Sequence, residues 1–132
     1  MSQSANATFN ITGWDEKPCD EIAGDSKLTR AHVTKVYSGD IEGEATVEYV
    51  MMHRADGDAE FVGYERVICR LAGRSGSFVL RHKGTFEGGT VKSDCVVVTG
   101  SATGELTGLR GESSFAAEHA EQYPITLKFD LD

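Results

Sequence analysis

Four residues of types that transfer protons or act as nucleophiles lie in four neighbouring segments of the chain: Tyr49, Glu65, His82 and Cys95. A carboxyl group and an imidazole are the usual general acids and bases near neutral pH. A cysteine next to a histidine can form a reactive thiolate–imidazolium pair. Whether any of this chemistry is available depends on how the chain brings the four segments together.

The segments that hold Glu65 and His82 alternate as strands with one buried face. In Phe61–Leu71 the odd positions are apolar except for Glu65, and the even positions carry the arginines. Ser77–Phe86 alternates in the same way, with His82 as the single ionisable residue of its apolar face. Because side chains alternate between the faces of a strand, both residues are predicted to point inward.

The turn between these two strands sets which residues lie opposite each other. A two-residue type II′ turn at Gly73-Arg74 would place Glu65 opposite His82. A four-residue loop at Gly73–Gly76 would instead place Val67 opposite His82. The register is therefore a hypothesis that depends on the loop.

The strand before Glu65 presents a tyrosine on its inward face. A three-residue loop at Asp56–Asp58 places Tyr49 opposite Glu65. The same register pairs Glu48 with Arg66 on the outer face, and opposite charges across a strand pair favour this alignment.

The strand after His82 adds a thiol to the same row. In Val91–Thr99 the inward positions include Cys95, and a two-residue Gly88-Gly89 turn places Cys95 beside His82. Together the three registers predict one lateral row, Tyr49–Glu65–His82–Cys95, on an otherwise apolar wall.

The whole chain is predicted to be a single all-β domain, residues 1–132. Short alternating segments separated by turn residues are typical of a barrel or sandwich. We expect an eight-stranded antiparallel closed barrel, just wide enough to be filled by side chains or to hold one small ligand. The predicted strands are Ala5–Gly13, Lys27–Tyr37, Glu44–His53, Phe61–Leu71, Ser77–Phe86, Val91–Thr99, Glu105–Phe115 and Tyr123–Leu131.

Three connecting segments show no convincing binding motif. Trp14–Asp25 is acidic and is predicted to be a solvated loop, because it lacks the pattern of an EF-hand calcium loop. The glycines of Thr99–Gly111 do not have the spacing of a phosphate-binding loop. Ala116–Gln122 has the composition of about one helical turn, with His119 as a solvated surface residue.

Composition limits the partners and the compartment. The formal net charge of −8 argues against nucleic acid and anionic membranes, which both require a basic face. We expect no signal peptide and no transmembrane helix, and the odd number of cysteines without metal spacing indicates a reducing compartment. We expect a cytoplasmic protein without a cofactor, and a homo-oligomer is compatible with the sequence. The cysteines are Cys19, Cys69 and Cys95.

Several motifs together resemble a family of small bacterial proteins of unknown function. They are Gly39–Glu44 (GDIEGE), Phe61–Arg66 (FVGYER), Gly73–Phe78 (GRSGSF) and the Gly100–Gly111 run. The resemblance covers nearly the whole chain and implies a fold similar to the allene oxide cyclase barrel. The wider barrel superfamily includes plant allene oxide cyclases, dirigent proteins and bacterial spirocyclases, which enclose apolar substrates. No catalytic residue of theirs matches a position of this chain, so the resemblance implies fold more than activity.

Each residue of the row has a functional and a structural interpretation. Glu65 and His82 are candidate catalytic residues for proton transfer, or they form a hydrogen bond that only holds the strands in register. A metal site at Glu65, His82 and Cys95 is conceivable, with His32 and His53 on other strands, but no spacing demands it. The candidate ligand-binding residues are Tyr49, Phe61, Phe78 and Cys95.

Three functions follow from the predicted barrel. The first is binding of a small apolar molecule in the lumen, with cofactor-free isomerisation or cyclisation as its catalytic form. The second is a non-catalytic carrier or sensor that uses the same pocket. The third is a barrel without a cavity that acts through its surface as an assembly module, its lumen packed by Phe9, Phe61, Phe78, Phe86, Leu106 and Phe129.

Overall fold

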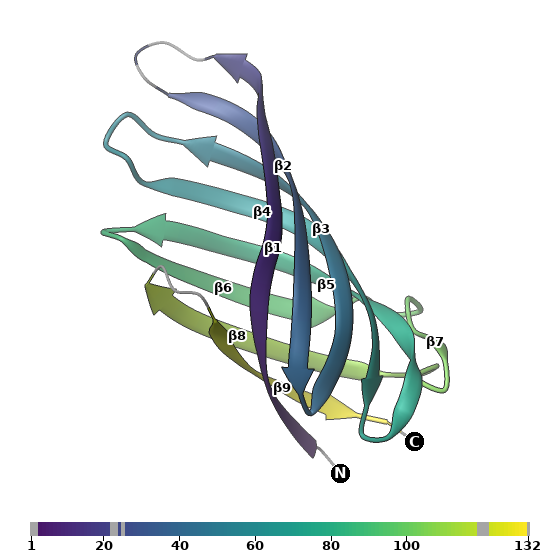
Figure 1. Ribbon diagram of the computed structural model, residues 1–132. Coiled ribbons are helices and arrows are strands. Elements are labelled where there is room, and N and C mark those ends of the chain that lie inside the picture. The colour runs from purple at the N-terminus through teal and green to yellow at the C-terminus, as the bar shows by residue number, and fades with distance from the viewer. Residues whose placement is uncertain (1–2, 22–23, 25, 119–121, 132) are drawn as a thin grey trace.

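The protein is an eight-stranded antiparallel closed β-barrel, as predicted (Figure 1). The structure, a computed structural model, describes residues 3–21, 24, 26–118 and 122–131, and this part of the chain contains no helix. Hydrogen-bonded neighbours follow the order β4-β3-β2-β1-β9-β8-β6-β5, and pairing of β5 with β4 closes the ring. The two-residue strand β7 adds to the end of β5. The strands are β1 (Gln3–Glu21), β2 (Lys27–Gly39), β3 (Ile41–His53), β4 (Ala59–Leu71), β5 (Arg74–Glu87), β6 (Thr90–Val97), β7 (Thr103–Gly104), β8 (Arg110–Glu118) and β9 (Tyr123–Asp130).

The interior divides into two apolar regions separated by charged and polar side chains. We call the first region the packed half; it contains Leu71, Phe78, Leu106, Leu127 and Phe129 among its buried residues. We call the second the open half; its buried residues are Ala31, Val33, Val47, Tyr49, Met51 and Phe61. Between them along β2, β4 and β5 lie three buried residues that we call the polar layer: Lys35, Glu65 and His82.

The prediction of a solvated loop at Trp14–Asp25 is wrong over most of its length, because β1 continues to Glu21. Residues 22, 23 and 25 lie outside the described residues. A bulge between Ile11 and Gly13 shifts the alternation of β1 by one residue. Ile11, before the bulge, lies opposite the inward-facing Lys35 and lines the lumen cavity, although it is 38 % exposed. After the bulge the even-numbered residues Trp14 and Glu16 turn toward the lumen.

Among the described residues, the second part of β1 has a strand partner on one side only. Pairing with β9 ends at Phe9 opposite Tyr123, whereas pairing with β2 continues to the end of β1. This leaves one edge of β1 without a described strand neighbour at the upper end of the barrel (Figure 1). Charged side chains on such an edge discourage pairing with another chain. The acidic composition that predicted a loop is thus compatible with an edge strand.

The hairpin between β4 and β5 has a different turn from either one predicted. Its two central residues are Ala72 and Gly73, both with positive φ (52° and 76°), as a type I′ turn requires. Glu65 consequently lies opposite Leu80, and His82 lies opposite Gly63. The predicted pairing of Glu65 with His82 is therefore wrong by two residues, although both residues keep the predicted face.

The register of β3 with β4 is also shifted by two residues. The loop contains five residues, 54–58, instead of three, and it is closed by a hydrogen bond from the Arg54 amide to the Asp58 carbonyl (2.8 Å). Tyr49 therefore lies opposite Gly63, not Glu65. On the outside, Glu48 does not face an arginine and instead accepts a hydrogen bond from His32.

The register of β5 with β6 is as predicted. Glu87 and Thr90 flank the two-residue turn Gly88-Gly89, and Cys95 lies opposite His82. The observed row across four strands is consequently Tyr49–Gly63–His82–Cys95, in which glycine takes the place predicted for Glu65.

The last third of the chain differs from the prediction in its boundaries. The predicted strand Glu105–Phe115 is strand only from Arg110, where β8 begins, because residues 105–108 form a turn region that follows β7. Residues 116–118 of the predicted helical turn belong to β8, and 119–121, including His119, lie outside the described residues. The final strand ends at Asp130, one residue before the predicted Leu131.

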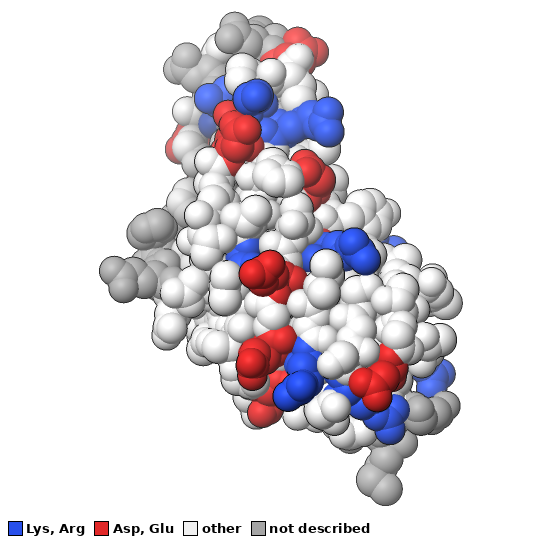
Figure 2. All heavy atoms as spheres, turned by 45° about the vertical axis from the view of Figure 1, so that its right-hand side comes forward, with Lys and Arg blue, Asp and Glu red and all other residues white. Residues whose placement is uncertain are grey.

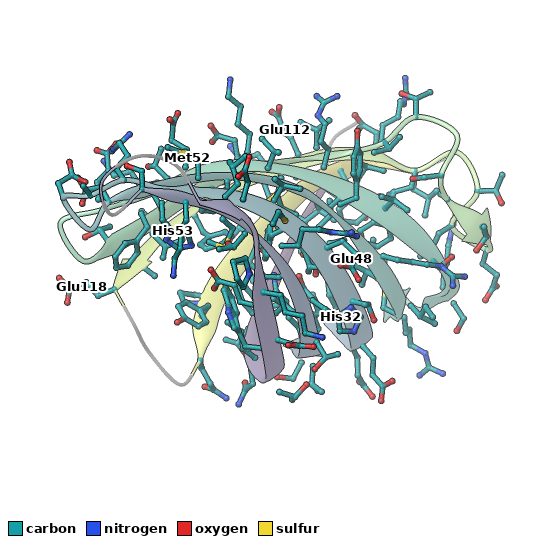
Figure 3. The ribbon with its side chains drawn as sticks, turned by 90° about the horizontal axis from the view of Figure 1, so that it is seen from above. His32, Glu48, Met52, His53, Glu112 and Glu118 are labelled. Carbon is teal, nitrogen blue, oxygen red and sulfur yellow. The ribbon has the colours of Figure 1, made fainter. Side chains whose placement is uncertain are left out.

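The outer surface of the barrel carries charged, polar and apolar side chains. On the face shown in Figure 2, acidic and basic side chains are interspersed among uncharged ones. His32 and Glu48 form one of the outer pairs, with Nδ1 and Oε1 2.5 Å apart (Figure 3). Large apolar side chains are also exposed on the outside of the strands, among them Val50, Val62, Tyr64 and Ile68.

Two inward-facing glycines make room for aromatic rings of the open half. A Cβ atom at Gly63 would lie 2.4 Å from the Glu48 carbonyl oxygen and 2.7 Å from Cδ1 of Tyr49. A Cβ atom at Gly84 would lie 2.4 Å from Cζ of Phe61. The rings of Tyr49 and Phe61 thus lie over glycines of the neighbouring strands, and this arrangement requires the absence of a side chain.

We expect Gly63→Ala to destabilise the protein by about 1–3 kcal/mol, the usual cost of adding a methyl group where no space exists. Urea unfolding measures this change. Val62→Ala, on the exposed side of the same strand, is the matched control and should change stability by less than about 1 kcal/mol. Equal effects of the two substitutions would contradict the close packing of Tyr49 over Gly63.

Candidate functional site

Glu65 lies at the centre of a buried hydrogen-bond network. Its Oε1 accepts from Lys35 Nζ (3.1 Å) and from His82 Nε2 (2.6 Å), and its Oε2 accepts from the Tyr37 hydroxyl (2.5 Å). The side chains of Glu65, His82 and Lys35 are at most 2 % exposed. The carboxylate is thus removed from water but surrounded by three donors.

Glu65 is ionised in this environment. Burial alone would raise its pKa, but the positive charge of Lys35 and the hydrogen bonds from His82 and Tyr37 outweigh burial and lower the pKa to about 2. Burial likewise acts to lower the pKa of Lys35, and the negative charge of Glu65 raises it overall. At neutral pH the two residues therefore form a buried ion pair.

The ionised carboxylate determines how His82 is oriented. A carboxylate can only accept hydrogen bonds, so Nε2 of His82 carries a proton and donates it to Glu65. On the other side of the ring, Nδ1 lies 3.2 Å from Ser93 Oγ and 3.2 Å from Cys95 Sγ. Hydrogen bonds thus connect Cys95 and Ser93 through His82 to Glu65.

The remaining acids of this region are held in their neutral forms. Burial raises the pKa of Cys95 to about 11 and the pKa of Tyr37 well above its usual range. Burial also raises the pKa of Tyr49 to about 12, against the positive charge of Lys35. Cys95 is therefore a thiol at neutral pH and lacks the thiolate that a nucleophilic cysteine requires.

A cavity of about 940 Å³ occupies the open half and its mouth. Its volume lies within the range of pockets that bind small molecules. Aromatic and aliphatic side chains from β1 to β6, β8 and β9 form most of the wall, among them Phe9, Trp14, Val33, Tyr49, Met51, Phe61, Phe86, Val91, Phe115 and Tyr123. Among the described hollows, none of comparable volume lies inside the packed half.

Lys35 connects the network with this cavity. It is the member of the polar layer that also lines the cavity, and its Nζ lies 4.3 Å from the centroid of the Phe9 ring. Tyr49, also in the cavity wall, packs edge-on against His82 with ring centroids 5.6 Å apart. Glu65, His82 and Cys95 therefore lie behind Lys35 and Tyr49 and do not face the cavity directly.

A second group of polar side chains lies at the mouth of the cavity. Glu16 accepts from the Trp14 indole (2.9 Å) and from Thr29 (2.7 Å), and its Oε2 lies 2.7 Å from His53 Nε2. Burial would raise the pKa of Glu16, but these hydrogen bonds lower it. In Figure 3, His53 and Met52, adjacent in β3, lie on opposite sides of the sheet. Glu16 thus joins the extended part of β1 to β2 and β3.

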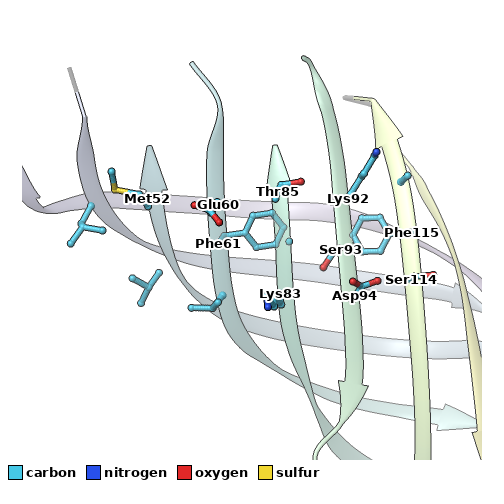
Figure 4. Close-up of a pocket in the computed structure, with 15 residues that line it drawn as sticks. Met52, Glu60, Phe61, Lys83, Thr85, Lys92, Ser93, Asp94, Ser114 and Phe115 are labelled. Atoms are coloured by element: carbon cyan, nitrogen blue, oxygen red, sulfur yellow. The ribbon is translucent and has the colours of Figure 1, made fainter. Parts of the chain in front are cut away.

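A second hollow, of about 800 Å³, lies mainly on the outer surface of β3 to β6 and β8 (Figure 4). Most of the residues that line it are the outward-facing members of these strands, such as Met52, Glu60, Lys83 and Asp94. It holds no buried charged residue. We therefore take the lumen cavity as the candidate site.

The structure places the candidate residues in two groups. Glu65, His82 and Cys95 belong to the buried network, whereas Tyr49 and Phe61 line the cavity. Phe78, a candidate ligand-binding residue, lies in the packed half and does not line the cavity. In the described residues, no group of three or more His, Cys, Asp or Glu is arranged to hold a metal ion.

Sequence analysis missed four contributors to the site: Lys35, Tyr37, Trp14 and Ser93. Lys35 and Tyr37 share the parity of the apolar residues Ala31 and Val33 in β2, so the alternation contained the signal for an inward lysine. No comparable signal existed for Trp14, because the bulge in β1 changes its face.

The chain belongs to the DUF3224 family, described as a protein family of unknown function, whose sequence model matches residues 5–129. The predicted membership in a family of unknown function is thereby confirmed. The chain is also similar to a DUF3224 protein of unknown function from Shewanella oneidensis MR-1, known from a crystal structure. The two share 28 % sequence identity with a TM-score of 0.87, over 100 % of this chain and 98 % of the other. No curated protein matches the chain, and no described helix is long and apolar enough to cross a membrane.

We expect Lys35→Met to destabilise the protein by about 3–5 kcal/mol, because it leaves the Glu65 carboxylate buried without its counter-ion. The double variant Lys35→Met/Glu65→Gln removes both charges and should recover part of this loss. Chemical denaturation measures both, with Lys17→Met on the exposed part of β1 as the control. A single variant as stable as the wild type would contradict a buried ion pair.

The depressed pKa of Glu65 also predicts a pH dependence. Its folded-state pKa of about 2 lies below the ordinary 4.5, so its contribution to stability is fully present above pH 4.5. The contribution is lost as the pH falls from 4.5 toward 2. We therefore expect the difference in unfolding free energy between wild type and Glu65→Gln to shrink over this interval. A difference that stays constant with pH would show that Glu65 has an ordinary pKa.

Proposed function

We propose that this barrel binds a small, largely apolar molecule in the cavity of the open half. The observation that carries the proposal is the cavity of about 940 Å³, walled by aromatic rings and bordered by the buried ammonium of Lys35. Apolar pockets with a few fixed polar groups are the usual form of small-molecule sites. The net negative charge of the chain fits a ligand that is not a nucleic acid.

The division of the interior supports binding over a purely structural barrel. Phe78, Leu106 and Phe129 fill the packed half, and each fully buried residue of this type contributes about 1.5–3 kcal/mol to folding. The open half has fewer buried residues and retains the cavity. Stability and binding are thus provided by different ends of the same barrel.

A cofactor-free isomerase or cyclase is the second candidate function. The observation that favours it is the continuous chain of contacts from Cys95 and Ser93 through His82 and Glu65 to Lys35 at the cavity. Through such a chain Glu65 and His82 would hold or relay a proton while the dry cavity orients the substrate. The similarity to the allene oxide cyclase barrel, noted from sequence motifs, agrees with this chemistry at the level of fold only.

We expect an apolar ligand to raise the melting temperature and to change the emission of Trp14, the single tryptophan of the chain, which lines the cavity. A ligand at 100 times its dissociation constant adds about 2.7 kcal/mol of stability. The probes are a panel of apolar ketones, polyenes and carboxylic acids, measured by thermal unfolding and by titration of fluorescence.

A matched pair of variants locates the binding site. Val91→Trp places a large side chain in the cavity and should reduce the thermal shift, whereas Val96→Trp, on the outer face of the same strand, should leave it unchanged. Equal shifts in both variants would place binding outside the lumen.

Substitution of Glu65 separates an enzyme from a carrier. If the barrel is an isomerase, Glu65→Gln should abolish turnover of a bound substrate and leave its affinity within a few-fold of wild type. If the barrel is a carrier, no turnover is found in either protein. Product analysis of bound ligands before and after incubation gives the readout, with folding of the variant verified by circular dichroism.

A further inference from the structure

The cavity wall contains two adjacent hydrogen-bond donors at the side of the polar layer. Lys35 and Tyr49 both line the cavity, and Lys35 lies close enough to Tyr49 that its charge and a hydrogen bond lower the pKa of the tyrosine against the larger effect of burial. Most of the remaining wall is apolar. A ligand that fills the cavity therefore meets these two donors at one end and mainly aromatic and aliphatic surface along the rest of its length, up to the mouth with Glu16 and His53.

Both donors have capacity that the described residues do not use. An ammonium group has three N–H donors, and Glu65 Oε1 takes one of them, at 3.1 Å. The face of the Phe9 ring lies beside the same ammonium and is a weaker partner than an oxygen atom. The Lys35 ammonium also forms a side-chain hydrogen bond with the Tyr49 hydroxyl. Because an ammonium group can only donate, the hydroxyl oxygen accepts this bond and the O–H of Tyr49, in the cavity wall, stays available as a donor.

The ion pair determines the charge that a ligand can bring. The positive charge of Lys35 is already balanced by the ionised Glu65, with the two groups in direct contact. A carboxylate in the cavity would add a second buried negative charge without a second cation, which is costly. A neutral acceptor such as a carbonyl oxygen gains the hydrogen bonds without this penalty.

We propose that the ligand is an uncharged carbonyl compound, a ketone, aldehyde or ester, whose oxygen accepts hydrogen bonds from Lys35 Nζ and the Tyr49 hydroxyl. Its apolar part extends toward the mouth, where Trp14, Phe86 and Val91 line the wall. This inference rests on the proposed function and specifies the class of ligand for the same cavity.

The first test compares three probes of equal chain length: a methyl ketone, the corresponding alkane and the corresponding carboxylate. Hydrogen bonds from a charged donor typically raise affinity about tenfold to a hundredfold, so we expect the ketone to bind more tightly than the alkane by this factor. We also expect it to bind more tightly than the carboxylate at neutral pH. Calorimetry and Trp14 fluorescence measure the affinities.

Two variants connect this preference with the donors. Tyr49→Phe keeps the ring and removes the hydroxyl, and it should weaken ketone binding about three- to tenfold while leaving alkane binding unchanged. Lys35→Met should remove most of the preference, and if this variant does not fold, Tyr49→Phe carries the test. Tyr64→Phe, on the exposed outer surface, is the control and should change neither affinity.

Infrared spectroscopy gives an independent readout. With a carbon-13 label in the ketone, the bound carbonyl stretch is expected at lower wavenumber than in an apolar solvent, and the shift should decrease in Tyr49→Phe. A bound carbonyl with the frequency of the apolar solvent would overturn the inference.

The outcomes separate this inference from the proposed function. Equal affinity for ketone and alkane, or tightest binding of the carboxylate, overturns the carbonyl inference and leaves lumenal binding established. Absence of binding by all three probes and by the wider panel overturns both.

Discussion

The buried ion pair between Lys35 and Glu65 is the interaction on which the arrangement of the interior depends. Each charge alone in this position would be strongly unfavourable, because it is removed from water. The pair is tolerated since Tyr37 and His82 complete the hydrogen bonding of the carboxylate. Lys35 lies on β2 and Glu65 on β4, so the pair crosses the intervening strand β3 and requires these three strands to keep a single register.

Small residues in the neighbouring strands make this crossing sterically feasible. Lys35 lies opposite Ala45 in β3, and Gly63 in β4 lies between Tyr49 and His82. The bulk missing at these two positions is filled by the long side chains that form the network. A buried polar network with all members satisfied is rigid, which suits the base of a binding cavity because its donors are held in place before a ligand enters.

The two apolar regions on either side of the polar layer have different roles. Close packing in the packed half contributes stability that does not depend on a ligand. The open half exposes aromatic rings to the cavity and ends at the mouth, where Glu16 joins β1 to Thr29 and His53. The edge of β1 without a described strand partner lies at this end, so among the described strands the mouth has fewer pairings than the rest of the barrel.

Period-two alternation in the sequence determined the strands, the closed barrel and the inward direction of Glu65, His82 and Cys95, because the face of a side chain depends only on its position along the strand. It did not determine the registers next to β4. There the turn Ala72-Gly73 and the five-residue loop 54–58 shifted the pairing by two residues, which preserves every face but changes every neighbour. Glu65 still reaches His82 because residues diagonal across a strand pair lie within reach of long side chains. Only the tertiary structure decided that Lys35 is the counter-ion and that Trp14 faces the lumen, since the first depends on a contact across three strands and the second on a bulge that alternation does not predict.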